Sequence, residues 1–183
     1  GSFYREFGGN AGATVPQFAH VPMILGADGK KLSKRHGATA VGDYQHLGLL
    51  PGAMLNFLSL LGWSTGDDIE VMTMPQLIEK FDTRGLQKKA AIFDTKKLEW
   101  MNGQHLALIP LADLAPIVAP ALVKAGYTTR AELESRRDWF HGLLDLLRVR
   151  SRVIDDIVRQ AAPYFQDHVE YDPEAVNKQW RDA

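Results

Sequence analysis

Apolar residues recur at helical spacing through most of this chain, and this pattern constrains the fold more than any other feature. From Pro51 onward they fall three and four residues apart between proline and glycine breaks, whereas alternating apolar and polar residues are scarce. One short apolar run, Phe18 to Leu25, is typical of a buried strand and leads into a turn at Ala27 to Gly29. The sequence therefore predicts a mainly α fold with a small strand-and-loop region near its N-terminal end.

Capping residues mark the expected helix boundaries. Pro51 begins a helix that ends before Gly62, Thr73 caps the next, and Asp94 caps a helix over 95–101 that Gly103 ends. Thr129 and Glu132 form a capping box. Further helices are expected over 110–125, broken by Pro116 and Pro120, and over 137–147, 151–162 and 173–180.

Composition excludes several classes of protein. The 183 residues contain 45% hydrophobic residues, 21 Lys and Arg against 22 Asp and Glu, and no cysteine. Such values indicate a globular chain of one or two domains and exclude disulfides, thiol catalysis and Cys-type zinc sites. No apolar run approaches the roughly 18 residues that span a bilayer. A net charge of -1 argues against nucleic-acid binding by bulk charge and leaves only local basic patches.

The chain divides into three predicted parts. Residues 1–15 begin with Gly-Ser and are rich in glycine, which indicates a tag remnant or a flexible extension. Residues 16–105 and 106–183 form two further parts, because Gly103 and Pro110 flank a loop-like passage.

The loop KLSKR, Lys31 to Arg35, is the strongest candidate for chemistry. Four cations, at Lys30, Lys31, Lys34 and Arg35, surround one hydroxyl at Ser33. Ammonium groups so clustered can neutralise the charge that grows on a departing pyrophosphate. A solvated basic turn is the alternative, and the P-loop pattern is absent. Since no apolar residue is expected to anchor this loop, we expect it to be mobile.

Four blocks of sequence carry a family resemblance. Residues 16–38, which include KLSKR, resemble bacterial glutamyl-tRNA synthetases, and KLSKR is similar to the KMSKS signature of class I synthetases. The resemblance continues through 50–63 and 91–103 and, more weakly, through 170–176.

This resemblance implies a ligase that joins glutamate to tRNA(Glu) through a glutamyl-adenylate formed from ATP. It implies that Lys34 and Lys31 are catalytic, and that Lys31, Ser33, Lys34 and Arg35 meet the ATP phosphates. Residues 16–105 would be the end of the catalytic region with a stem-contact part, and residues 106–183 an incomplete helical anticodon-binding part. No HIGH signature occurs in the sequence, so the glutamate pocket lies mostly outside this chain and we expect the chain alone to be inactive.

Two groups of basic residues are predicted to contact RNA. The resemblance places the first against the inner side of the tRNA and the second near the anticodon. Solvated helical faces are the alternative interpretation. The candidates are Arg84, Lys88, Lys89, Lys96 and Lys97 in the first group, and Arg148 and Arg150, with Arg152 beside them, in the second.

No metal is assigned to the chain, since none of its six histidines has metal-ligand spacing, and magnesium would arrive with ATP. Two alternatives remain: a non-catalytic helical tRNA-binding module, and a fragment of a glutaminyl-type synthetase. We expect a cytoplasmic monomer that does not contact membranes.

Overall fold

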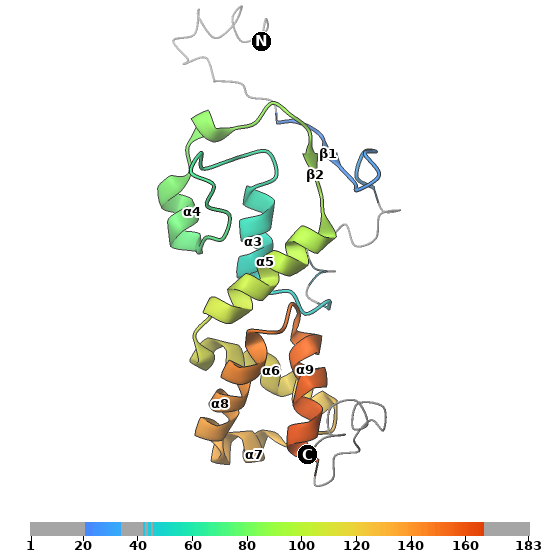
Figure 1. Cartoon of the computed structure of the whole chain (residues 1–183), viewed down its shortest axis with the longest axis vertical. Helices are drawn as coiled ribbons and strands as arrows, with labels where there is room; N and C mark the ends of the chain where they lie inside the picture. The colour runs from blue at the N-terminus through green and yellow to red at the C-terminus, as the bar shows by residue number, and fades with distance from the viewer. Residues whose placement is uncertain (1–20, 34–41, 43, 45, 167–183) are drawn as a thin grey trace, which may run out of the picture.

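The computed structural model describes residues 21–33, 42, 44 and 46–166. Helices dominate this part, and a small sheet lies at one end (Figure 1). Helix α5, Thr95–Leu108, crosses the middle of the molecule between two groups of helices. The predicted mainly α fold with a strand-and-loop region near its start is confirmed.

The sheet has two short parallel strands, β1 (Ile24–Leu25) and β2 (Ala91–Ile92). Ile24 is in register with Ala91 and Leu25 with Ile92. Parallel strands need a long crossover, and here it contains α3 (Pro51–Ser59), α4 (Met74–Lys80) and the 3-10 turn η2 (Thr83–Gly85). The strand predicted over 18–25 is thus seen only at Ile24–Leu25, and its first residues lie outside the described part.

Capping explains where the helices of the first half begin. Asp94 accepts hydrogen bonds from the amides of Lys96 and Lys97, and Thr73 precedes α4 with Gln76 bonded back to its amide. An apolar cluster holds this half together. It includes Phe57 of α3, Met101 of α5 and Phe93. Both predicted caps are therefore confirmed.

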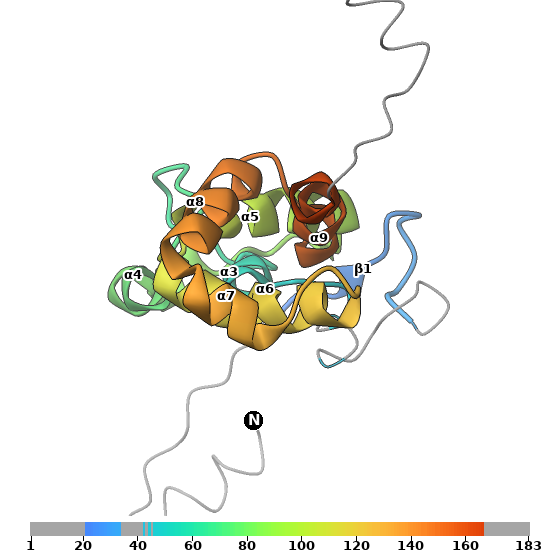
Figure 2. The same cartoon turned by 90° about the horizontal axis from the view of Figure 1, so that it is seen from below.

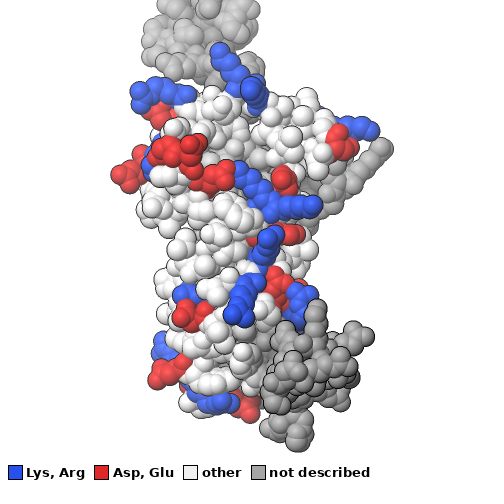
Figure 3. Space-filling model, viewed as in Figure 1, with Lys and Arg blue, Asp and Glu red and all other residues white. Residues whose placement is uncertain are grey.

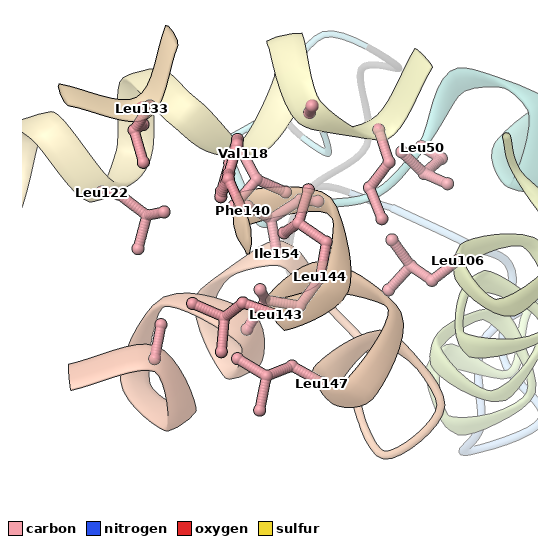
Figure 4. Packing of buried hydrophobic residues seen from close by; sticks show 14 of the residues in the cluster. Leu50, Leu106, Val118, Leu122, Leu133, Phe140, Leu143, Leu144, Leu147 and Ile154 are labelled. Carbon is pink, nitrogen blue, oxygen red and sulfur yellow. The ribbon is translucent and has the colours of Figure 1, made fainter. Parts of the chain in front are cut away.

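The second half is a bundle of four helices followed by the 3-10 turn η3, Ala162–Phe165 (Figure 2). Apolar residues of α8 repeat at helical spacing and point into its core, which Figure 4 shows. Helices α6 and α8 each contact the other three helices of the bundle. The four helices are α6 (Leu111–Lys124), α7 (Arg130–Ser135), α8 (Arg137–Arg148) and α9 (Ile154–Ala161).

Two helix predictions were wrong. Gly103 does not end α5, which continues to Leu108; the small residue sits inside the helix because an added Cβ would lie 3.1 Å from the carbonyl oxygen of Ser151. Pro116 and Pro120 do not break α6. Both prolines are exposed, so water can bond the carbonyl oxygens that lose their helical partners. The helix expected over 173–180 and the extension 1–15 lie outside the described residues.

The two halves share one core. Leu50 and Ala53 from the start of α3 and Leu106 from α5 are buried in the same cluster as the bundle residues (Figure 4). Helix α5 runs unbroken across residues 105 and 106, where the sequence predicts a boundary. Of the described helices, none is by itself long and apolar enough to cross a membrane; α5 and α6 meet that criterion only jointly, with a bend of 119° between them.

Candidate nucleotide and nucleic-acid interface

The start of the KLSKR loop is built onto strand β1. A tight turn precedes it, in which the Gly26 amide donates to the Lys30 carbonyl at 2.8 Å and Gly29 adopts φ +74°. Lys31 then forms an antiparallel bridge with Leu25, and the Leu32 amide donates to the Ile24 carbonyl at 3.0 Å. The backbone at the first two signature residues therefore has a defined path.

Leu32 anchors this stretch to the protein interior. Its half-buried side chain packs against the apolar cluster of the first half, which contains Tyr44, Leu49 and Phe93. The premise that no apolar residue holds the loop is therefore wrong, because Leu32 supplies the contact. Lys34 and Arg35 lie outside the described residues.

The charged and polar side chains before that point face solvent. Lys30, Lys31 and Ser33 are exposed, and within the described ranges neither ammonium group forms an ion pair. Two unpaired ammonium groups on a backbone fixed to a strand can bind an oxyanion without first breaking an ion pair.

Strand β2 brings the first group of RNA candidates beside the signature. Leu25 is paired with Ile92 in β2 on one side and with Lys31 on the other, and its carbonyl accepts from the Phe93 amide at 2.8 Å. Lys88 and Lys89 lie three and two residues before the start of β2, and Lys96 lies in the first turn of α5 after it. The sheet thus gathers two candidate sites that lie more than fifty residues apart in the sequence.

The basic residues around the sheet differ in how freely they can bind a phosphate. Lys88, Lys89 and Lys96 are exposed and form no ion pair with another described residue; we call these three the lysine surface. Lys97, by contrast, is paired with Glu70.

Arg84 is likewise held by a carboxylate. Its Nε and Nη2 donate to Asp82, with the Nη2 to Oδ2 distance at 2.6 Å. The hydrogen bonds from Arg84 lower the pKa of Asp82 to about 2, and Asp82 in turn raises the pKa of Arg84. A neighbouring surface cleft lined by Trp63, Lys80 and Arg84 offers no free cation, since Lys80 bonds Asp67 at 2.6 Å.

In the second group, Arg148 and Arg150 have different environments. Arg148 is 17% exposed, donates from Nη1 to the Ile109 carbonyl at 2.6 Å and pairs with Asp145 at 2.5 Å. It therefore joins the end of α8 to the α5–α6 turn. Arg150 is exposed and unpaired among the described residues.

Arg152 is a further basic residue, and it lies next to α5. It is exposed, and its Cγ lies 3.7 Å from the Cβ position of Gly103. Figure 3 shows Lys and Arg side chains following one another down the middle of this face, over α5 and toward the bundle. Charge counting along the sequence separates these residues, and only folding brings them together.

The sequence analysis did not predict the carboxylates that pair with three of the candidates, Arg84, Lys97 and Arg148. The spacing of Asp82 and Arg84 is a usable signal, since side chains two residues apart in a turn can meet, whereas Glu70 lies 27 residues before Lys97. Among the described residues, no group of three His, Cys, Asp or Glu side chains is placed to hold a metal ion.

Comparison with known proteins matches two stretches of the chain to two family models. Residues 4–100 match the family model described as tRNA synthetases class I (E and Q), catalytic domain. Residues 111–183 match the model of an anticodon binding domain. A module without any catalytic-domain sequence is therefore not favoured.

Curated relatives and a solved structure agree with these matches. Glutamate–tRNA ligase 2 of Caldanaerobacter subterraneus subsp. tengcongensis is 41% identical over 165 residues, which are 90% of this chain and 34% of the relative. The glutamate–tRNA ligase of Desulforudis audaxviator is 39% identical over 167 residues, which are 91% of this chain and 33% of the relative. A crystal structure of a glutamate tRNA ligase from Elizabethkingia meningosepticum, in complex with its amino acid, superposes with a TM-score of 0.76 at 27% identity, covering 99% of this chain and 38% of that one.

The chain spans about a third of the length of the curated relatives it matches. Within that third it includes both a catalytic-domain segment and an anticodon-binding segment, and α5 joins them. The chain belongs to the class I tRNA synthetases of the E and Q group.

Proposed function

We propose that this chain is part of a glutamate–tRNA ligase. In that reaction a carboxylate oxygen of glutamate attacks the α-phosphate of ATP, and pyrophosphate leaves with the bonding electron pair. A hydroxyl of the terminal ribose of tRNA(Glu) then attacks the activated carbonyl, and AMP leaves. The names of the relatives support glutamate as the amino acid over glutamine.

The KLSKR loop supplies positive charge to the departing pyrophosphate. Lys34 carries the main catalytic contact, Lys31 assists it, and Ser33 and Arg35 complete the set that meets the ATP phosphates. Lys31 is exposed and forms no ion pair with another described residue, which supports this role. These residues supply cations and a hydroxyl rather than carboxylates, so magnesium enters bound to the nucleotide.

The lysine surface and Arg150 contact the phosphate backbone of tRNA. Their exposure and lack of ion pairs within the described part support this assignment. Arg84, Lys97 and Arg148 are weaker candidates, because each would have to exchange a carboxylate for a phosphate. Residues 16–105 act as the end of the catalytic region with the stem-contact part, and residues 106–183 act at the anticodon. The full-length ligase works as a monomer in the cytoplasm.

One observation carries the proposal: the lysine surface and Lys31, which pair with no carboxylate among the described residues, lie next to the same two-stranded sheet. The test is binding of a tRNA(Glu) transcript to this chain over a range of salt concentrations. Release of counterions gives a slope of log affinity against log salt of about -0.7 to -0.9 for each phosphate contact. A slope near zero would contradict the proposed contact with tRNA phosphates.

A further inference from the structure

Two buried asparagines cross-link backbone segments in this fold. Among the described residues, Asn56 and Asn102 are the asparagines with no exposed surface. Asn56, in α3, bonds within the first half: its amide donates to the Glu70 carbonyl at 2.9 Å, and its Oδ1 accepts from the Met72 amide at 2.8 Å and lies 3.0 Å from Nε2 of His105 in α5.

Asn102, in α5, joins the two halves instead. Its Oδ1 accepts from the Leu50 amide at 2.7 Å, and its side-chain amide donates to the carbonyls of Arg152 at 2.5 Å and Gly48 at 3.4 Å. The Gly48 carbonyl also accepts from the Ile154 amide at 3.1 Å. One side chain thereby bonds both the segment that leads into α3 and the segment that leads into α9.

The surrounding geometry leaves little room at this joint. Gly48 has φ +70°, and a Cβ there would lie 2.9 Å from the amide nitrogen of Ile154. On the other side of the joint, a Cβ at Gly103 would lie 3.1 Å from the Ser151 carbonyl oxygen. The backbones of the two halves therefore meet at two places where a glycine on one side allows the close approach.

Apolar contacts alone would not fix the angle between the halves. Leu50, Leu106 and Ile154 share one core across the joint, and such contacts tolerate small rotations. Hydrogen bonds weaken steeply when they bend, so a buried amide that bonds both halves restricts their relative orientation.

We propose that Asn102 is a positioning residue for RNA recognition, which holds the two halves at the angle where both basic surfaces engage one tRNA. The lysine surface lies on one half and Arg150 on the other. Binding through linked sites gains affinity only when the geometry allows simultaneous engagement, and a fixed joint reduces the entropy lost on binding. This inference rests on the proposed function, since it requires that tRNA is the ligand.

Asn102→Ala tests the inference, with Asn56→Ala as the matched control. Each substitution removes one completely buried amide and its hydrogen bonds. Affinity is measured in the full chain for two probes at fixed salt: the complete tRNA(Glu) transcript and an isolated anticodon stem-loop of the same tRNA. The stem-loop engages one half, whereas the transcript engages both.

Asn102→Ala is expected to weaken binding of the transcript by about tenfold while leaving stem-loop binding within about twofold. Asn56→Ala is expected to leave the ratio of the two affinities unchanged. An unchanged ratio in Asn102→Ala, or an equal loss in Asn56→Ala, overturns the inference. If the unaltered chain fails to bind the transcript, the proposed function itself is overturned, which is a separate result.

Gly103→Ala keeps the test decisive if Asn102→Ala does not fold. It removes no hydrogen bond and improves helix propensity, yet its Cβ presses on the Ser151 carbonyl and opens the joint. A transcript-to-stem-loop ratio that falls by about threefold supports the inference, and an unchanged ratio contradicts it.

Discussion

His105 lies with its Nε2 3.0 Å from Oδ1 of Asn56, and this contact determines which ring nitrogen carries the proton. The same Oδ1 accepts from the Met72 amide, so it is an oxygen and cannot donate to the ring. Nε2 must therefore be protonated in the neutral imidazole. Burial lowers the pKa of His105, which keeps the ring neutral near pH 7.

The first prediction concerns the pH dependence of stability. The side chain of an unfolded histidine has a pKa of about 6.5. Burial lowers the pKa of His105 in the fold, so the folded chain binds this proton only at lower pH. The unfolded chain thus takes up more protons as pH falls through that range, and the free energy of unfolding decreases. Urea unfolding at pH 7.5 and 5.5 measures the loss, which His105→Gln should reduce.

His46→Gln is the control, because His46 is exposed. The acidic groups act in a different window: Asp67 and Asp82 have pKa values of about 2, and the stability they contribute is lost only as pH falls through the range from 3.8 to about 2. Equal pH dependence in His105→Gln and the unaltered chain would contradict the assignment to His105.

The second prediction compares two glycines. A Cβ at Gly85 would lie 2.4 Å from the Ser64 carbonyl oxygen and 2.5 Å from Nε1 of Trp63, whose N–H donates to the Asp82 carbonyl. Gly85→Ala should lower the free energy of unfolding by about 1–3 kcal/mol, because backbone atoms must move. Gly142→Ala, in α8 with nothing within 4 Å, should raise it by about 0.5–1 kcal/mol. Chemical denaturation of both variants gives the two signs, and destabilisation by both would refute the argument.

The third prediction separates a structural arginine from an RNA contact. Arg148 bonds the Ile109 carbonyl and Asp145 while largely buried, so Arg148→Ala should destabilise the chain by about 1–3 kcal/mol. It should leave the salt dependence of tRNA binding unchanged, whereas Arg150→Ala should reduce the slope without loss of stability. Thermal unfolding together with binding titrations distinguishes the two residues. A smaller salt slope for tRNA binding in Arg148→Ala would contradict this prediction and would indicate that Arg148 contacts RNA.

Local signals in the sequence were sufficient to predict much of the fold. The capping box of Thr129 and Glu132 is confirmed, with the Thr129 amide 2.8 Å from Glu132 Oε2, because cap chemistry acts over a few residues. The helix end predicted at Gly103 was wrong for the opposite reason. Glycine lowers helix propensity locally, but here a tertiary contact with Ser151 requires the small residue inside α5.

The sequence was sufficient to pick out the basic residues of the candidate sites, but not to predict which of them lie close together in the fold. KLSKR stands out by charge density, yet its proximity to the lysine surface depends on the pairing of β1 with β2 across a long crossover. The pairing of Lys97 with Glu70 and the three hydrogen bonds of Asn102 depend on contacts between residues that are remote in sequence. No periodic pattern encodes such contacts.

The last prediction asks which cations on the catalytic-domain half meet phosphates. Lys88 and Lys89 are exposed and unpaired within the described part, whereas Arg84 is held by Asp82. The double variant Lys88→Ala/Lys89→Ala should therefore reduce the magnitude of the salt slope for the tRNA(Glu) transcript by about 1.4–1.8, while Arg84→Ala changes it by much less than one. Both variants remove exposed side chains, so unfolding midpoints should stay close to that of the unaltered chain. An equal fall in slope for Arg84→Ala would mean that the Asp82 pair opens on binding, and free lysines alone would no longer define the interface.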